Sequence, residues 1–278
     1  MATRSATTSA SGPATTRELV GLGTVIDSGK GPQLCVGAVA TSLPPQCDGP
    51  PITNWDWARA PQSDSANGVR WGAYAVIGTY DGTHFTLTRP VTTPEAFTGK
   101  RPPDPSTADY KTPCPTPSGG WRVLDASRTN QEALDAALAQ AERLPGYAGS
   151  WVDQSINDAD GNASPEAMND PTKLILDVLT TGDIPADTAV LRRTWGGSLC
   201  VSRGKRTVAG LQSIQLKITD DPALKSQFLS DGVNYSTGAV DLQVIWDDGA
   251  IQHRMDAAYG KGLVRVTSTL FPYVAKGS

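Results

Sequence analysis

Residues 174–178 read LILDV and residues 240–245 read VDLQVI, and each of these apolar runs begins one copy of a repeated unit. A turn of Gly and Asp and a helix-like stretch follow each run. The first copy then ends in WGGSLCV at residues 195–201, and the second ends in YGKGLVRV at residues 259–266. This order predicts a strand–helix–strand unit, whose two strands run parallel through a right-handed crossover. The repeat therefore predicts the fold of the C-terminal half.

The residues shared by the two copies are those that build a fold. Gly196 and Gly260 follow the helical stretches, where a left-handed residue commonly ends a helix, so both are predicted C-caps. Asp177 and Asp241 occupy matching strand positions. We expect both carboxylates to face solvent, and we assign no chemistry to the repeat itself.

The chain as a whole has the pattern of an α+β protein. Residues 17–90 contain short apolar runs separated by turns, which predicts a small β-barrel resembling an OB-fold. Residues 119–275 alternate strand and helix patterns, which predicts an α+β sandwich of tandem βαβ units with ferredoxin-like packing from residue 199 onward. The Pro-rich residues 91–118 are the expected linker. The Ser/Thr-rich residues 1–16 are the expected disordered tether.

Composition and charge limit the classes of partner. The 278 residues carry 24 Lys and Arg against 28 Asp and Glu, a net charge of −4, which argues against a nucleic-acid partner. No stretch approaches the roughly 20 apolar residues of a transmembrane helix. Residues 1–16 lack the apolar region of a signal peptide. We therefore expect that Met1 replaces a removed signal, which ended either at the cleavage site of a secreted protein or at the lipidated cysteine of a lipoprotein.

Four cysteines predict two disulfides and an oxidising compartment. Cys35 and Cys47 flank a Pro-containing loop, Cys114 lies in the Pro-rich linker, and Cys200 lies in a strand of the first repeat. An even number of cysteines in a loop-rich chain is typical of exported proteins. Of the three pairings open to four cysteines, we predict Cys35–Cys47 and Cys114–Cys200. The alternative, a metal site, lacks a C-x-x-C motif and a nearby histidine.

Three tryptophans and one carboxylate form the predicted binding site. Trp55 and Trp57 lie in the loop after Cys47 with Asp56 between them, and Trp71 begins the next strand. Alternate aromatic side chains near a carboxylate can stack on a sugar or a peptide, so Trp55, Asp56, Trp57 and Trp71 are the candidate residues. The alternative is that these tryptophans pack in the core of a small domain, where large aromatic side chains bury the most area.

The densest group of oxygen ligands lies at residues 157–162, which read NDADGN and contain Asp158 and Asp160, with Glu166 nearby. Calcium prefers about six to eight such oxygens. The EF-hand spacing fails, because Gly161 at the sixth position of such a loop would place an isoleucine at the first. An exposed Asp/Asn loop is the alternative. We predict no metal and no cofactor.

No catalytic motif is present in the sequence. No serine lies in a G-x-S-x-G context, and the two histidines, His84 and His253, have the pattern of surface residues. The Gly-rich stretches lack the strand-to-helix context and the lysine of a phosphate-binding loop. We therefore predict no catalytic residue.

The repeat unit, with its Asp-Gly turn, short helix and YGKGLVRV ending, resembles the small α+β modules of exported actinobacterial proteins. Some of these are lipoproteins of unassigned function, and some are prodomains of secreted proteases. The resemblance covers residues 172–270 and implies an exported protein. A prodomain would act as a protease inhibitor or a folding chaperone, but no protease domain follows these residues in this sequence.

Taken together, these features favour a non-catalytic binding protein of the bacterial cell envelope, either secreted or lipid-anchored. We expect its partner to be another protein or an envelope component, held by the long loop from Cys35 to Trp57, because loops on a rigid scaffold carry recognition. The first alternative is a cell-wall glycan hydrolase, which needs two carboxyl groups about 5–10 Å apart in a cleft. The second is the inhibitor or chaperone.

Overall fold

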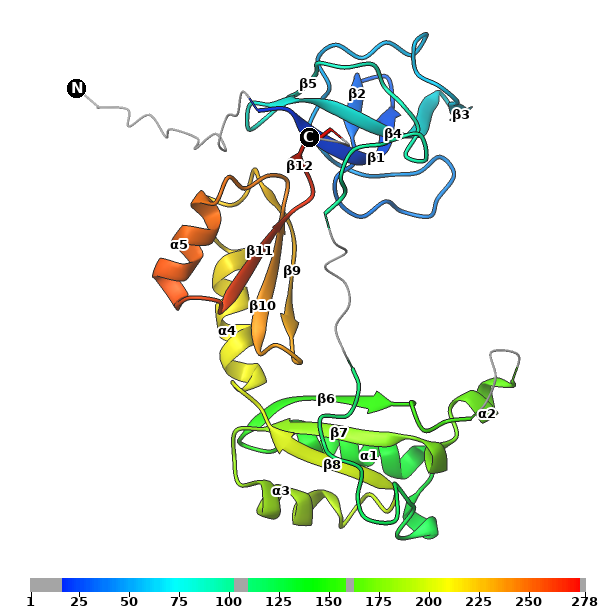
Figure 1. Ribbon diagram of the computed structural model, residues 1–278, viewed down its shortest axis with the longest axis vertical. Coiled ribbons are helices and arrows are strands. Elements are labelled where there is room, and N and C mark those ends of the chain that lie inside the picture. The colour runs from blue at the N-terminus through cyan, green and yellow to red at the C-terminus, as the bar shows by residue number, and fades with distance from the viewer. Residues whose placement is uncertain (1–16, 103–109, 159–162, 276–278) are drawn as a thin grey trace, which may run out of the picture. The chain divides into compact units, whose positions relative to one another are not determined.

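The computed structural model describes residues 17–102, 110–158 and 163–275, and in these residues it contains three separate sheets (Figure 1). The protein is a mixed α+β protein, as the sequence predicts. The expected tether at residues 1–16 lies outside the described residues. Within the described part of the chain, no helix is long and apolar enough to cross a membrane.

The chain divides into two compact units that are not continuous in sequence. The first unit comprises Met1–Pro105, Lys217–Gly232 and Asp241–Ser278, and the second comprises Ser106–Leu216 and Val233–Val240. The C-terminal residues belong to the first unit because β12 (Phe271–Pro272) pairs with the first strand of the chain. We describe each unit by itself.

The first unit is built on a long antiparallel pair of strands, β1 (Leu19–Asp27) and β4 (Val69–Tyr80), which pair along the whole of β1. Shorter strands complete this six-stranded sheet: β2 (Pro32–Leu34), β3 (Asp64–Ala66), β5 (Phe85–Leu87) and β12. The order β12-β1-β4-β3 ends in two strands that do not pair with each other. No closed barrel is found in the described residues, so the predicted OB-like barrel is not confirmed.

The core of the first unit lies on one face of β4. Alternate residues of this strand, Tyr74, Val76 and Tyr80, are buried there, as the period-2 pattern of a strand requires. The other buried apolar side chains of this core are Leu19, Val25, Leu34, Val36, Ile52, Phe85, Ile245, Trp246 and Leu270. Residues from both ends of the chain therefore share one hydrophobic core.

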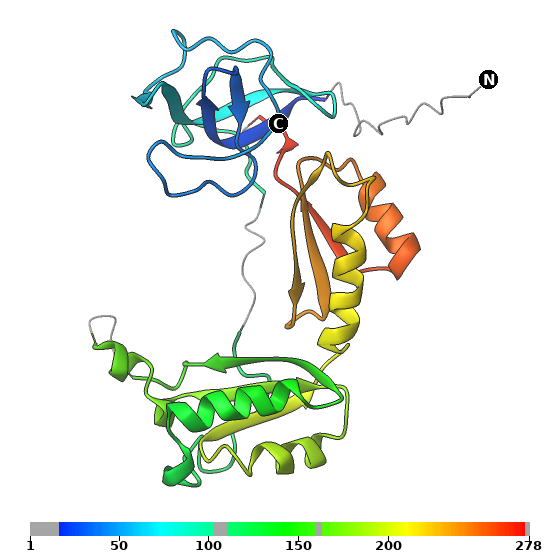
Figure 2. The same cartoon turned by 180° about the vertical axis from the view of Figure 1, so that it is seen from behind.

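The second unit contains a three-stranded sheet of order β6-β7-β8. β6 (Tyr147–Asp153) is antiparallel to β7 (Ile175–Thr180), and β7 is parallel to β8 (Ser198–Arg203). The crossover from β7 to β8 passes through α3 (Ile184–Leu191), so the first copy of the repeat is the strand–helix–strand unit that the sequence predicts. Figure 2 shows α3 and α1 (Gln131–Glu142) on one side of this sheet.

The second copy of the repeat lies in the third sheet, of order β11-β10-β9. This sheet contains β9 (Phe228–Asn234), β10 (Ala239–Val244) and β11 (Val264–Ser268). The helix α5 (Ala250–Tyr259) connects β10 to β11, and α4 (Val208–Thr219) precedes β9. The predicted ferredoxin-like packing would have included β8 in this sheet. That packing is not found, because β8 pairs with β7 in the second unit. The remaining helical segments are short: Ala126–Arg128, α2 (Pro165–Met168) and Pro171–Lys173.

The two glycines of the repeat have different roles. Gly260 is the predicted C-cap of α5, with its N–H bonded to the Asp256 carbonyl, and its φ of 101° and ψ of 146° form a conformation that favours glycine but is not the left-handed helical one. Gly196 is not a C-cap, because α3 ends earlier, with Arg192 as its C-cap. A Cβ on Gly196 would lie 2.2 Å from the Asp125 carbonyl oxygen. Close packing, and not helix termination, requires glycine at this position.

Candidate functional site

The structure contains two disulfides in the pairing that the sequence predicts. Cys35 is bonded to Cys47 across 12 residues, and Cys114 is bonded to Cys200 across 86 residues. The first disulfide closes a loop in the first unit, and the second lies within the second unit. The short loop forms one wall of a hollow of about 930 Å³.

The loop between Cys35 and Cys47 is folded back on itself. The backbone N–H of Ala40 donates to the carbonyl of Gln46 at 2.9 Å, and the Ser42 hydroxyl donates to the Pro44 carbonyl at 2.8 Å. Leu43 lies at the turn, with 78% of its surface exposed. A disulfide at its base and a hydrogen-bonded turn at its tip give this loop a defined shape.

The chain after Cys47 is fixed against the sheet by close backbone contacts. The N–H of Leu34 donates to the Pro50 carbonyl at 3.0 Å, and the N–H of Ile52 donates to the Pro32 carbonyl at 2.9 Å. A Cβ on Gly49 would lie 1.7 Å from the Leu34 carbonyl oxygen, so this approach is open only to glycine. The loop therefore leaves and rejoins the sheet at fixed points.

A groove of about 930 Å³ lies between this loop and the sheet. Its lining contains Ile26 of β1, Gln33 of β2 and Val69 at the start of β4. The loop contributes residues 37–40 and 44–48, and β9 contributes Phe228 and Leu229. Asp48 is the one charged residue in this lining. The lining therefore combines apolar side chains with the polar Ser28, Gln33 and Gln46, and it contains a single carboxylate.

A second hollow of about 350 Å³ adjoins the first. Both are lined by Asp48, Phe228 and Leu229. The second hollow continues past Pro50 to Ile245, with other apolar and small residues between them. The two hollows therefore meet at residues from the beginning of β9, and we consider them together. We call this the loop groove.

Gln227 holds the beginning of β9 in place. This residue is buried, and its side-chain amide donates to the Tyr80 hydroxyl at 3.1 Å and to the Gly82 carbonyl at 3.2 Å. Its backbone carbonyl accepts the N–H of Ile245 at 2.8 Å. The adjacent Phe228 and Leu229 are therefore presented to the loop groove from a fixed backbone.

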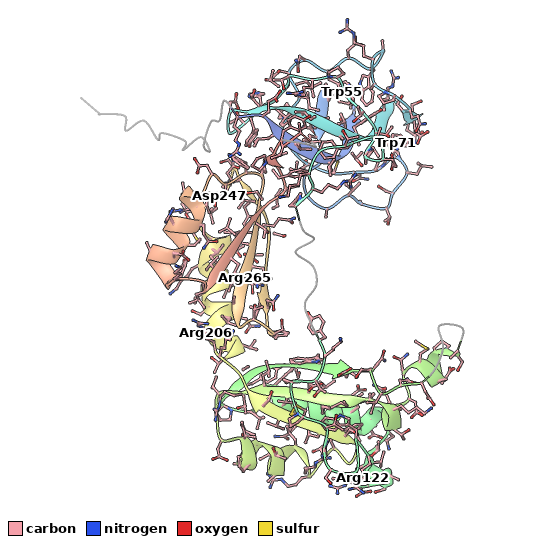
Figure 3. The ribbon with its side chains drawn as sticks, in the orientation of Figure 1. Trp55, Trp71, Arg122, Arg206, Asp247 and Arg265 are labelled. Atoms are coloured by element: carbon pink, nitrogen blue, oxygen red, sulfur yellow. A yellow bond between two sulfur atoms is a disulfide. The ribbon has the colours of Figure 1, made fainter. Side chains whose placement is uncertain are left out.

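The predicted tryptophan site is divided between two faces of the sheet (Figure 3). The rings of Trp55 and Trp57 contact each other edge to face with centroids 5.1 Å apart, and Trp55 contacts the buried Tyr74 at the same distance. Trp71 is an odd number of residues from Tyr74 along β4, so its side chain points to the opposite face. Asp56 accepts a hydrogen bond from the N–H of Ala58 at 2.8 Å.

Trp55 and Trp57 therefore lie with the core of the first unit, against which both are partly buried. Burial raises the pKa of the Tyr74 hydroxyl beside them, and the Arg70 guanidinium lies 4.8 Å from the centre of the Trp57 ring. The four predicted residues do not form one platform. Whether Trp55, Asp56, Trp57 or Trp71 contacts a ligand stays a prediction.

The residues that shape the loop groove were only partly visible in the sequence. The loop itself was singled out, because Cys35 and Cys47 flank it. Phe228 and Leu229 were not, because they lie about 180 residues further along the chain and have no motif around them. Tertiary packing brings them there, since Leu229 packs against the core of the first unit.

The candidate calcium loop does not gather ligands in the part of the chain that the structure describes. Asp160 lies outside the described residues. Asp158 forms an ion pair with Lys173, which lowers its pKa, and Glu166 lies in α2. No group of three or more His, Cys, Asp or Glu side chains is close enough to hold a metal ion in the described residues.

Asp177 and Asp241 differ in a way that their matching positions did not predict. Asp241 is partly exposed and accepts a hydrogen bond from the Arg265 guanidinium at 2.7 Å. Asp177 is fully buried, so the expectation that it faces solvent is wrong. It lies in the central strand of its sheet, where a covered face leaves no solvent side. Burial, with a smaller contribution from Asp153, raises its pKa to about 7.

Comparison with known proteins adds no family to these observations. A scan of the chain against models of protein families gives no match, and a search of curated proteins gives no significant match. The loop groove and the buried carboxyl of Asp177 are therefore the two features from which function can be argued.

Proposed function

We propose that this protein is an exported binding protein that holds an extended, largely apolar segment of another polypeptide in the loop groove. The observation that carries the proposal is the meeting of two hollows at Phe228 and Leu229, at the beginning of an edge strand.

The size of the groove favours a chain-like ligand. Sites for compact small molecules measure about 300–1,000 Å³. The first hollow, at about 930 Å³, lies at the upper end of this range, and a second of about 350 Å³ adjoins it. A ligand that fills both must pass Phe228 and Leu229. An extended peptide does this by placing successive side chains in the two hollows.

The edge of β9 supports the same ligand. β9 is the terminal strand of its sheet, and no described strand pairs with its outer edge. An extended peptide can add to such an edge through main-chain hydrogen bonds, while pockets beside the edge select its side chains. Phe228 and Leu229 lie both in this strand and in the lining of the groove.

The disulfide of the loop supports both the binding role and the location. A wall that is already ordered in the free protein loses little entropy when a ligand binds. The Cys35–Cys47 bond and the hydrogen-bonded turn order this wall. Two disulfides are also typical of proteins from oxidising compartments. We therefore place the protein outside the cytoplasm.

Glycan hydrolysis fits this groove less well. A hydrolase needs two carboxyl groups that face one cleft, and the lining of the first hollow contains one, Asp48. Apolar residues such as Pro44, Pro45 and Leu229 form the walls instead. These residues suit apolar side chains better than the hydroxyl groups of a sugar.

The proposal is tested with a library of short random peptides and a matched pair of variants. Val39→Glu places a charge in the groove at a partly exposed position, and Leu216→Glu places the same charge at an exposed leucine of α4, outside the groove. We expect selected peptides with alternating apolar residues to lose at least about tenfold in affinity for Val39→Glu. Leu216→Glu should bind like the unmodified protein. Equal affinity for both variants would overturn the proposal.

A further inference from the structure

One face of the β6-β7-β8 sheet is covered by a segment with no regular secondary structure. In the strand register Asp177 lies opposite Trp151 of β6 and Cys200 of β8. Residues in register point to the same face of a sheet, so these three side chains share a face. The cluster formed by Leu176, Val178 and Leu199 with α1 and α3 occupies the other face.

Residues 110–118 lie over the Asp177 face and are attached at three points. The ring of Tyr110 contacts that of Trp151, with centroids 6.0 Å apart. The backbone N–H of Thr112 donates to an Asp153 carboxylate oxygen at 2.7 Å. Cys114 is covalently bonded to Cys200. Figure 1 shows this stretch passing across the sheet on the side away from α1. We call residues 110–118 the strap.

The carboxyl group of Asp177 is enclosed between the sheet and the strap without a partner of opposite charge. Neither of its oxygens has a hydrogen-bond partner among the described residues. The Thr112 hydroxyl opposes the rise in the Asp177 pKa, although its geometry falls short of a hydrogen bond. The hydroxyls of Ser198 and Ser202, on the same face of β8, are likewise buried without a partner.

The ionisable groups that the sheet places around Asp177 do not stabilise its charge. β6 contributes the Asp153 carboxylate, and β8 contributes Cys200, which is in a disulfide. The strap contributes Tyr110, whose ring lies on Trp151, and the exposed Lys111. None of the residues that β6, β7 and β8 place on this face is Lys, Arg or His. An ionised Asp177 therefore has no cation beside it on the sheet.

We propose that the strap is a proton-controlled latch, closed over the sheet while Asp177 is neutral and released from it when Asp177 ionises. A neutral carboxyl fits beneath the strap and can donate to a neighbouring hydroxyl. An ionised carboxylate must recover hydration, because burying an unpaired charge is costly. Water then reaches the face between Tyr110 and Thr112. The Cys114–Cys200 bond keeps the strap tethered in both states.

The two disulfides of the protein provide the measurement. Dithiothreitol is added to the full chain at several values from about pH 5 to about pH 9, and each disulfide is followed by alkylation and peptide mass spectrometry. The rate at which Cys114–Cys200 is reduced is divided by the rate at which Cys35–Cys47 is reduced in the same sample. This ratio removes the pH dependence of the reagent's own thiolate. We expect the ratio to rise several-fold, with its midpoint near the pKa of Asp177, about 7.

Two substitutions identify the titrating group. Asp177→Asn preserves shape but cannot ionise, and it should hold the ratio constant. Asp241→Asn changes the matching position of the second repeat, beside Arg265. In this variant the ratio should still rise with pH as it does in the unmodified protein. A ratio that is flat in the unmodified protein, or that rises equally in Asp177→Asn, would overturn the latch.

A measurement on the unmodified chain covers the case in which Asp177→Asn does not fold. Hydrogen exchange at the amides of residues 110–112, including the Thr112 N–H bonded to Asp153, is compared below and above pH 7, after correction for the intrinsic exchange rate. Protection should fall above the midpoint at these residues and stay constant in β5, which lies in the other unit. Equal protection of residues 110–112 at both pH values would exclude release of the strap.

Discussion

Asp177 and Cys200 are register partners on two parallel strands, so a fully buried carboxyl lies beside a disulfide on one face of a sheet. The carboxyl holds its proton up to about pH 7 in the folded protein. In the unfolded chain it loses that proton near its ordinary pKa of 3.8. This difference connects the stability of the protein to pH.

We expect Asp177 to make the folded state less stable as pH rises from about 4 to about 7. The folded state binds more protons than the unfolded state in this window, so the free energy of unfolding falls, by roughly 2–4 kcal/mol from this residue, and then stays level. Asp177→Asn removes this contribution. Urea unfolding at several pH values should show that the free energy of unfolding decreases less with rising pH in the variant than in the unmodified protein. Identical slopes would show that Asp177 does not titrate in this range.

Removal of the two disulfides should have unequal costs. The chain-entropy model gives about 4.6 kcal/mol for a closed loop of the Cys114–Cys200 length and about 2.9 kcal/mol for that of Cys35–Cys47. We therefore expect substitution of both Cys114 and Cys200 by Ala to lower the free energy of unfolding more than substitution of both Cys35 and Cys47 does. The double substitution of Cys35 and Cys47 should instead have the larger effect on peptide binding. The reverse order of either effect would contradict this assignment.

Gln227→Ala should destabilise the first unit by about 2–4 kcal/mol. The substitution leaves the Tyr80 hydroxyl and the Gly82 carbonyl without their partner in a buried place, and each such loss costs about 1–3 kcal/mol. The control is Gln243→Ala, because the Gln243 side chain is exposed and accepts a hydrogen bond from the Ser230 hydroxyl at the surface. Denaturant unfolding should show a change below about 0.5 kcal/mol for the control.

The tryptophans should separate into two classes in a stability assay. Trp55→Ala removes a partly buried ring that packs on Trp57 and Tyr74, and we expect it to cost about 2–4 kcal/mol. Trp71→Ala, on the opposite face of β4, should cost about 1 kcal/mol or less. If Trp55→Ala left the melting temperature unchanged but weakened peptide binding, Trp55 and Trp57 would act as the predicted binding site.

Local patterns in the sequence were enough for several elements. The first repeat forms β7, α3 and β8 as predicted, because a buried strand and a short helix are each recognisable within a few residues. The C-cap at Gly260 follows from the same local chemistry. The structure also contains the cysteine pairing that we predicted from among three.

The assignment of strands to sheets depended on contacts between distant residues. β8 could pair with β7 or with a strand of the second repeat, and periodicity alone does not distinguish these partners. The structure places β8 beside β7 and returns β12 to β1. The first sheet also stays open, although its short strands and turns have the pattern of a barrel.

The sequence by itself determined where the strand, helix and turn patterns of the first repeat lie, because these depend on neighbours along the chain, and it reduced the cysteine pairings to three. Only the tertiary structure decided that Asp177 is enclosed while Asp241 meets Arg265. It also brought Phe228 and Leu229 to the loop of Cys35 and Cys47. Burial and the lining of a groove are set by what packs against a residue from elsewhere in the chain, and a local pattern does not contain that information.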